Sequence, residues 1–406
     1  QEAIQIGPDC AIPGATYSWS PSTGLSDPNI AQPIANPSST TTYTMSVTLP
    51  GGACIPSNQV VVTVTDPIDH YLPHNTNIAQ LRTITSITGN SIADKVFKVN
   101  GTLIIDEDFT FENCSFKMAE GAKIVVDDAD FIFESTGEDI ASIMACDTNK
   151  FWDGIYVDNQ LGNSSVQFPG SNKNILVSNM EFGIVAENNP VLFLNSVFFN
   201  RNNMTVDYNG VEETPFTVII NDCNFDCTSP LINGSGNPFY PSMGMRFEDV
   251  KYSNYSIAFE SFMDGSTYNG RAGSIFAVNS SIYLFEVEFE NFQNQLKPFG
   301  TDIAHEAIKI WGEEITDPWI IPNNPTVDIV GCRFHNTWSS IEAIDNVELK
   351  IDGNWFMENP STVLAYTKAI DVTDNSAPIE IVGNVIEDMD FGISLFGVYD
   401  ALIASN

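Results

Sequence analysis

From about residue 95 onward, the chain repeats a short pattern of alternating apolar and polar residues. One copy runs Leu194–Asn200 and the next runs Ile220–Asp226, each with a polar corner residue before a small residue and an aromatic one. Further copies occupy Phe111–Lys117, Phe247–Ser253, Ile329–His335, Ile351–Met357 and Ile381–Glu387. Alternation with period two sends every second side chain to one face of a strand. The pattern therefore predicts many short strands of the same build, joined by tight corners.

The spacing of these copies, widened in places by longer loops, indicates successive coils of a right-handed parallel β-helix. The aromatic position then forms an interior stack of Phe199, Phe225, Tyr252, Phe289, Phe334, Phe356 and Ile386. Two residues earlier, the same stack reads Cys114, Val197, Cys223, Val250, Val287, Cys332, Asn354 and Asn384. A second stack contains Gly183-Ile184, Ala307-Ile308, Ala369-Ile370 and Gly392-Ile393. We expect the two asparagines to start an internal amide ladder, and the cysteines to be structural.

Two other repeat folds do not fit this pattern. A leucine-rich repeat shows regular leucines and a fixed asparagine, which the repeat lacks. A propeller repeats about every 40 residues with blade signatures, which are also missing.

Residues 1–66 have a different character, with short strands separated by turns rich in Pro, Gly, Ser and Thr. The closing segment Gln59–Thr65 is a strong β-strand, and such a series of short strands predicts a small β-sandwich. Residues 67–94 are expected to be a connector and β-helix cap, with a short helix near residues 77–84 covering the open end of the coils. The predicted fold class is all-β: a small β-sandwich over 1–66, then the β-helix over 95–406.

Two segments resemble known families. Residues 17–21 (Tyr-Ser-Trp-Ser-Pro), 24–28 (Gly-Leu-Ser-Asp-Pro) and 40–44 (Thr-Thr-Thr-Tyr-Thr) resemble a PKD-like, immunoglobulin-type module. Residues 150–157 (Lys-Phe-Trp-Asp-Gly-Ile-Tyr-Val) resemble a recurring coil of pectin-lyase-like β-helices. Both are frequent in secreted proteins of Bacteroidota, so the resemblance implies a secreted or cell-surface protein exported by the type IX secretion system. It also implies that Trp19 is the core tryptophan of the sandwich, with an exposed sugar-stacking role as the alternative.

The charge and the cysteines limit the possible partners. Against 52 acidic residues stand only 16 Lys and Arg, a net charge of −36, which argues against nucleic acids and anionic membranes. No apolar run is long enough to span a bilayer.

Cys10 and Cys54 are placed to form a disulfide, which suits an oxidising compartment. No signal peptide is visible, and the last residues look like the middle of a repeat, so we expect the β-helix to continue.

Few residues suggest a catalytic, metal-binding or ligand-binding site. The only tight acidic group in a strand context is Asp127, Asp128 and Asp130, which is either a solvated turn or a Ca²⁺ site. A surface site is expected from residues in and after the longest insertion, near 290–325: His305, Lys309, Trp311, Arg333 and His335. No other metal ligands occur at strong spacing, and no cofactor is expected.

The sequence leaves two functions open. The first is a non-catalytic, adhesin-like surface protein that binds glycans, proteins or the secretion machinery. The second is an extracellular polysaccharide hydrolase or lyase, which rests on fold analogy alone.

Overall fold

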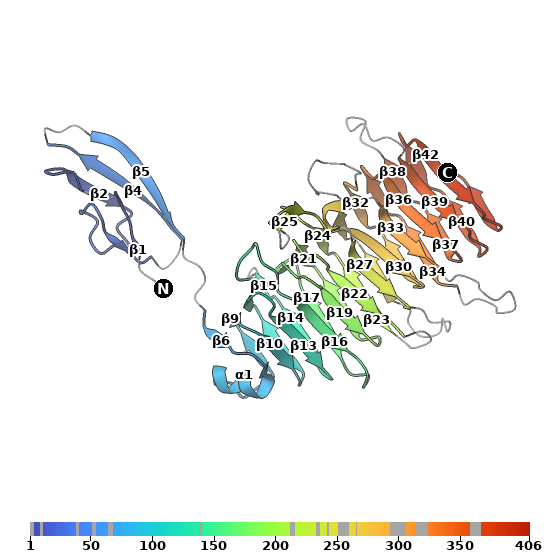
Figure 1. The fold of residues 1–406 in the computed structure, drawn as a ribbon, viewed down its shortest axis with the longest axis horizontal. Coiled ribbons are helices and arrows are strands. Elements are labelled where there is room, and N and C mark those ends of the chain that lie inside the picture. Colours follow the sequence, from blue (N-terminus) through green and yellow to red (C-terminus); the bar gives the residue numbers. More distant parts are fainter. Residues whose placement is uncertain are drawn as a thin grey trace. The chain divides into compact units, whose positions relative to one another are not determined.

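The computed structural model describes the chain except residues 1–3, 9–10, 38–39, 51–53, 64–67, 138–139, 212–215, 233–235, 242, 251–259, 265, 293–305, 313–323 and 358–366. The chain forms two compact units, Gln1–Ile68 and Asp69–Asn406. Figure 1 shows the first as a small group of strands and the second as a long stack of arrows.

The first unit is built from antiparallel strands. Strands β2 (Thr16–Ser20), β4 (Thr41–Thr48) and β5 (Cys54–Val62) form one sheet, and β1 (Ile4–Gln5) pairs with β3 (Ile34–Ala35). Trp19 is only 5% exposed, packs in a small core with Tyr43, and donates its indole N–H to the Ile30 carbonyl at 3.0 Å. This burial agrees with the expected core role of Trp19 rather than with sugar stacking.

The second unit is a parallel β-helix of three 12-stranded sheets. Sheet 1 contains β7 (Thr76–Asn77), β10 (Thr102–Ile105), β13 (Lys123–Asp127), β16 (Gly154–Asp158), β19 (Ile184–Glu187), β22 (Val206–Asn209), β27 (Met243–Glu248), β30 (Ser274–Val278), β33 (Glu306–Trp311), β36 (Ser339–Ile344), β39 (Lys368–Thr373) and β42 (Phe391–Phe396). Sheet 2 contains β8 (Ser91–Ala93), β11 (Phe109–Glu112), β14 (Asp130–Glu134), β17 (Ser165–Pro169), β20 (Val191–Asn195), β23 (Thr217–Asn221), β28 (Glu260–Asp264), β31 (Ile282–Phe285), β34 (Thr326–Val330), β37 (Glu348–Asp352), β40 (Ile379–Val382) and β43 (Ala401–Ala404). Sheet 3 contains β6 (His70–Leu72), β9 (Val96–Val99), β12 (Ser115–Met118), β15 (Ala141–Ala145), β18 (Ile175–Ser178), β21 (Val197–Asn200), β24 (Asn224–Asp226), β29 (Thr267–Asn269), β32 (Glu288–Glu290), β35 (Arg333–His335), β38 (Trp355–Met357) and β41 (Val385–Glu387).

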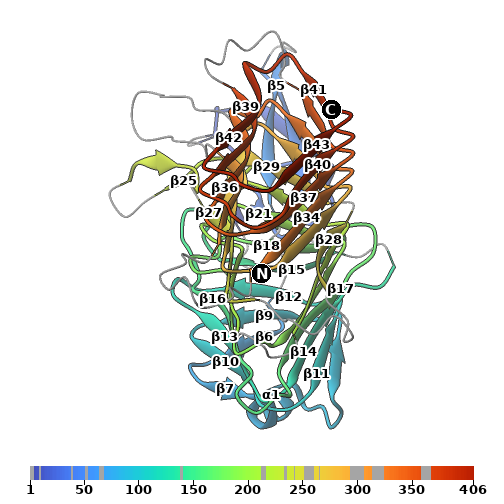
Figure 2. The same cartoon turned by 90° about the vertical axis from the view of Figure 1, so that its right-hand side faces the viewer.

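Each coil contributes one strand to each sheet, and the three sheets enclose one apolar core. Figure 2 shows the successive coils with strands of all three sheets. The hairpin of β25 (Leu231–Ile232) and β26 (Pro238–Phe239) and the short helix η1 (Gly270–Ala272) interrupt the regular coils. The predicted all-β fold with a parallel β-helix is confirmed. Its right-handed sense stays a prediction from the general rule for parallel connections.

The interior stacks follow the predicted slots, with one correction. Phe199, Phe225, Phe289, Phe334 and Phe356 occupy one register position in sheet 3, and the last three rings are stacked at centroid distances of 4.8 and 4.7 Å. The position between Phe225 and Phe289 belongs to Tyr268 and not to Tyr252 as predicted, and Tyr252 itself lies outside the described residues.

The physical reason for this error is that two corners of each coil look alike. Asp249 has φ 54° and follows a sheet 1 strand, whereas Asp222 has φ 50° and follows a sheet 2 strand. Both corners place a short polar residue in the left-handed region, which Asn and Asp tolerate best. The same local pattern therefore occurs at two places in the coil, and the slot assigned to Val250 belongs to Ser266.

The amide ladder is present in the last coils. Asn354 donates its side-chain N–H to Asn384 Oδ1 at 3.0 Å and to the Ile329 carbonyl at 2.8 Å, and Asn384 in turn donates to Asn406 Oδ1 at 2.9 Å. Asn354 and Asn384 are buried, so these bonds replace the water that their amides lose on folding.

Most of the described cysteines are structural. Cys114, Cys223 and Cys332 are fully buried, and burial raises the pKa of the Cys223 and Cys332 thiols to about 12. Cys146 is an exception to the expected burial, since it is exposed.

The β-helix begins earlier than the sequence indicated. Strands β6, β7 and β8 pair in parallel with β9, β10 and β11, so the expected connector over 67–94 supplies the first coil. The strands of this coil are only two or three residues long, which is too short for alternation to reveal them. Helix α1 (Ile78–Thr85) is capped by Asn77 and Gln80 and buries Ile78 and Leu81 against the coil, as expected of a cap.

Candidate functional site

The surface residues predicted from the sequence lie on two different sheets. Lys309 and Trp311 belong to β33 of sheet 1, where Lys309 forms a 2.7 Å ion pair with Glu342 and lies 5.3 Å from the Trp311 ring centroid. Arg333 and His335 belong to β35 of sheet 3, and His335 Nε2 lies 3.6 Å from a Glu288 carboxylate oxygen. The structure therefore does not gather them on one face. Lys309 and Trp311 lie on a regular strand rather than in an insertion, and His305 lies outside the described residues.

The predicted acidic group is divided by a corner. Asp127 ends β13, Asp128 occupies the corner with φ 51°, and Asp130 begins β14. The Asp130 carboxylate accepts a hydrogen bond from the Ser165 hydroxyl. Among the residues that the structure describes, no group of three or more His, Cys, Asp or Glu is placed to hold a metal ion. The predicted Cys10–Cys54 disulfide lies outside the described residues, because Cys10 and the Cys54 side chain are not described.

A concave surface lies on the outer face of sheet 1. A hollow of about 390 Å³ is lined by Tyr156, Glu181, Phe182, Val185, Asn203, Met204, Asp207 and Met243. A second hollow of about 420 Å³ shares Tyr156 and Val185 with it and extends to Asp127, Asp128, Asp158 and Glu187. The two hollows form one groove, which we call the sheet 1 groove. Both volumes fall in the range of small-molecule sites.

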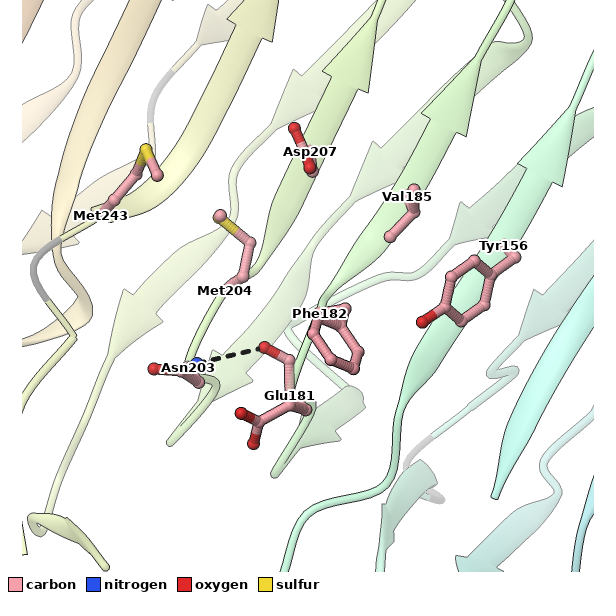
Figure 3. A pocket seen from close by; sticks show the side chains of 8 residues that line it. All are labelled: Tyr156, Glu181, Phe182, Val185, Asn203, Met204, Asp207 and Met243. Carbon is pink, nitrogen blue, oxygen red and sulfur yellow. Dashed lines mark hydrogen bonds between the residues drawn. The ribbon is translucent and has the colours of Figure 1, made fainter. Parts of the chain in front are cut away.

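The sheet 1 groove combines an apolar floor with carboxylate edges. Figure 3 shows the Tyr156 hydroxyl pointing toward the Phe182 ring, with Glu181 and Asn203 on one side and Asp207 on the other. Phe182 is 51% exposed, although it is a large apolar residue. The Asn203 amide donates a 3.4 Å hydrogen bond to the Glu181 carbonyl and ties the two turns together. The floor thus offers the exposed Phe182 ring, and the edges offer hydrogen-bond acceptors. Lys123 Nζ lies 5.1 Å from the centroid of the Tyr156 ring.

Three consecutive residues, Trp152, Asp153 and Gly154, position the groove. The Trp152 side chain is fully buried and donates its indole N–H to the Ser178 carbonyl at 2.7 Å, which anchors the start of β16. Gly154 has φ 133°, and a Cβ there would lie 2.1 Å from the Gly183 carbonyl oxygen. This close approach holds β16 against the turn that carries Glu181 and Phe182. The segment that carries the pectin-lyase-like resemblance therefore builds the groove.

Burial and neighbouring charge alter the acidity of the groove carboxyls. Partial burial, and then the charge of Asp153, raise the pKa of Glu181. Burial also raises the pKa of Asp153, an effect that Lys123 opposes, and raises the pKa of Asp207, an effect that Arg246 opposes. Desolvation disfavours the charged form of each carboxyl. The groove is therefore acidic, and Glu181 and Asp207 hold their protons more tightly than free carboxyls do.

Strand register explains which residues face the groove. Tyr156, Val185, Asp207 and Arg246 occupy directly opposed positions on β16, β19, β22 and β27, so they form one outward row. Arg246 lies 3.6 Å from Asp207 Oδ1 and also forms an ion pair with Glu248. The Asp207 Oδ1 atom is buried and has no hydrogen-bond partner among the described residues. Asp207 Oδ1 is thus held near the Arg246 guanidinium by charge rather than by a hydrogen bond.

Sequence reasoning missed Glu181, Phe182, Asp207 and Met243 because they lie in turns or at strand positions that look polar and incidental. The register between strands of successive coils brings these residues together. This register cannot be predicted unless the coil lengths are known. The one available signal was the 150–157 segment, which marks the strand at the centre of the groove.

Comparison with known proteins does not assign the chain to a family. No protein-family model matches the chain, and no curated protein matches it at a significant level. A search of the described helices for one long and apolar enough to cross a membrane found none.

Proposed function

We propose that this protein is a secreted or cell-surface β-helix that binds glycans through the sheet 1 groove without cleaving them. The observation that supports the proposal most directly is a half-exposed Phe182 beside Tyr156, in a groove whose edges carry acceptors. Sugar rings present apolar C–H faces and many hydroxyl donors, which match an aromatic floor edged by carboxylates. An export route through type IX secretion and an adhesive role on the cell surface belong to the same proposal and rest on the resemblance of the sequence.

The negative charge of the groove limits the class of glycan that it can bind. The groove carries Asp127, Asp158, Glu181, Glu187 and Asp207, in a chain of net charge −36. Anionic polysaccharides would be repelled, because like charges brought together in a partly desolvated site cost free energy. We therefore expect neutral glycans to bind.

A glycan array tests this proposal with one variant and one matched control. Phe182→Ala removes a half-exposed ring from the groove, and Tyr71→Ala removes a 60% exposed ring from β6 on sheet 3. We expect neutral-glycan signals for the native protein and for Tyr71→Ala, and a marked reduction for Phe182→Ala in the signal of the glycans that bind the sheet 1 groove. Equal signals for all three proteins would refute the groove as the binding surface.

Glycan hydrolysis is the second candidate, and one observation favours it. The raised pKa of Glu181 keeps its carboxyl protonated to higher pH than usual, which is what a general acid requires. A reducing-end assay on the glycans that bind separates the two functions. The binding proposal predicts no product release, whereas release that Glu181→Gln abolishes would establish the hydrolase instead.

A further inference from the structure

A second concave surface lies on the opposite side of the coil, far from the sheet 1 groove in the strand order. It is a hollow of about 340 Å³ at the corner between sheets 2 and 3, near the C-terminal end. Its exposed side chains are Arg333, Trp355 and Val385, which occupy directly opposed positions on β35, β38 and β41. Its floor is the backbone of Gly331 and Gly353. We call this surface the glycine corner.

The glycines at this corner are not required by packing. In earlier coils the same corner holds Asn113 with φ 49° and Asp222 with φ 50°, so a side chain is compatible with the turn. Gly353 has φ 65°, which lies in the region that Asn tolerates, and a Cβ there would meet nothing within 4 Å. At Gly331 the nearest atom to such a Cβ is Glu286 Cγ at 3.5 Å. The glycines therefore leave the surface bare where side chains would fit.

Exposed apolar and charged side chains lie beside this bare strip. Trp355 is 40% exposed and Val385 is 47% exposed, and the two residues lie side by side on adjacent strands. The Arg333 guanidinium is exposed and forms no ion pair with any residue in the described part of the chain. Glu288 occupies the position opposite Arg333 on the preceding coil. Indole, guanidinium and carboxylate in one row offer a ring face, donors and an acceptor.

The surrounding charge selects among sugars. Glu286, Glu288 and Asp352 all lie at or beside this corner, and Lys350 lies 4.0 Å from Asp352. A carboxylated sugar would meet more negative than positive charge, while a neutral sugar avoids that repulsion. We propose that the glycine corner is a second binding site, separate from the sheet 1 groove, for a neutral pyranose unit that stacks on Trp355 and exchanges hydrogen bonds with Arg333 and Glu288.

The indole N–H resonance of Trp355 reports on this site directly. It is identified in the spectrum of isotope-labelled protein as the signal that Trp355→Phe removes. The probes are maltose, cellobiose, lactose and mannobiose at millimolar concentration, with glucuronic acid as the anionic comparison. We expect at least one neutral disaccharide to shift the resonance and glucuronic acid to leave it unmoved.

The decisive variant is Gly353→Asn, which keeps a residue type that this corner already uses but fills the hollow. Its matched control is Gly137→Asn, at an open glycine with φ 80° and nothing within 4 Å. The sugar-induced shift should vanish in Gly353→Asn and persist in Gly137→Asn and in Phe182→Ala. The proposal is overturned if no neutral disaccharide moves the resonance, if Gly353→Asn responds like the native protein, or if Phe182→Ala abolishes the shift.

Discussion

At the scale of single residues, buried amides and groove acids behave differently on folding. The Asn354 and Asn384 amides leave water and form hydrogen bonds with neighbouring coils. Glu181 leaves water only in part and gains no cation to offset the loss. The first arrangement stabilises the coil, and the second weakens the fold at neutral pH while leaving acceptors available to a ligand.

Asn384→Ala should therefore destabilise the β-helix by about 1–3 kcal/mol, because the partner groups of Asn384 become buried without hydrogen bonds. Urea unfolding followed by circular dichroism measures this loss. Asn163→Ala is the matched control, since Asn163 is exposed, and it should change stability little. Equal effects of the two variants would mean that the ladder does not stabilise the coils.

Glu181→Gln should raise stability at neutral pH and reduce its dependence on pH. The pKa of Glu181 is higher in the folded than in the unfolded state, so the folded state binds the proton more tightly. Stability therefore falls as pH rises from the ordinary carboxyl range through the raised value. The neutral variant lacks this decline, although the gain is modest because the carboxyl keeps contact with water.

Urea midpoints at mildly acid and at neutral pH measure this effect. The native protein should lose more stability between the two than Glu181→Gln does. An unchanged pH difference would show that Glu181 is not desolvated in the groove.

At the scale of the elements, strand β16 is the part on which the groove depends. Gly154 lets β16 approach the turn before β19 so closely that no side chain fits, and Trp152 fixes its start. Gly154→Ala should cost at least about 3 kcal/mol, through the clash with Gly183 and the strained φ.

Thermal unfolding of Gly154→Ala tests this element. Gly137 also has a positive φ, 80°, but open space surrounds the new methyl group, so Gly137→Ala should cost only about 1–2 kcal/mol. If the two variants lose equal stability, the close approach of β16 is not what matters.

At the scale of the whole molecule, the two compact units should unfold separately. Trp19 is the largest buried side chain of the small core in the first unit. Trp19→Ala should cost about 3–5 kcal/mol, enough to unfold a unit of this size. Calorimetry should then show the β-helix transition unchanged, and a shift of both transitions would contradict the independence of the units.

Much of the β-helix was predictable because alternation and stacking leave a pattern in the sequence. The slots of Phe334, Phe356 and Asn384 could be assigned from the sequence for this reason. The first coil was not predictable, since β7 has only two residues, and Tyr252 was misplaced because two corners share one local pattern. The sheet 1 groove was harder still, because Glu181, Phe182 and Asp207 meet only through the register of separate coils.

The measurement that tests the central claim most directly is a calorimetric titration of one neutral glycan, chosen from the array, into native protein, Phe182→Ala and Tyr71→Ala. Truncating an aromatic residue at the centre of a binding site costs more than about 1 kcal/mol, and 1.4 kcal/mol corresponds to a tenfold change in affinity. We predict about a fivefold or greater loss of affinity for Phe182→Ala and native affinity for Tyr71→Ala. Equal affinity of all three proteins would contradict a glycan site in the sheet 1 groove.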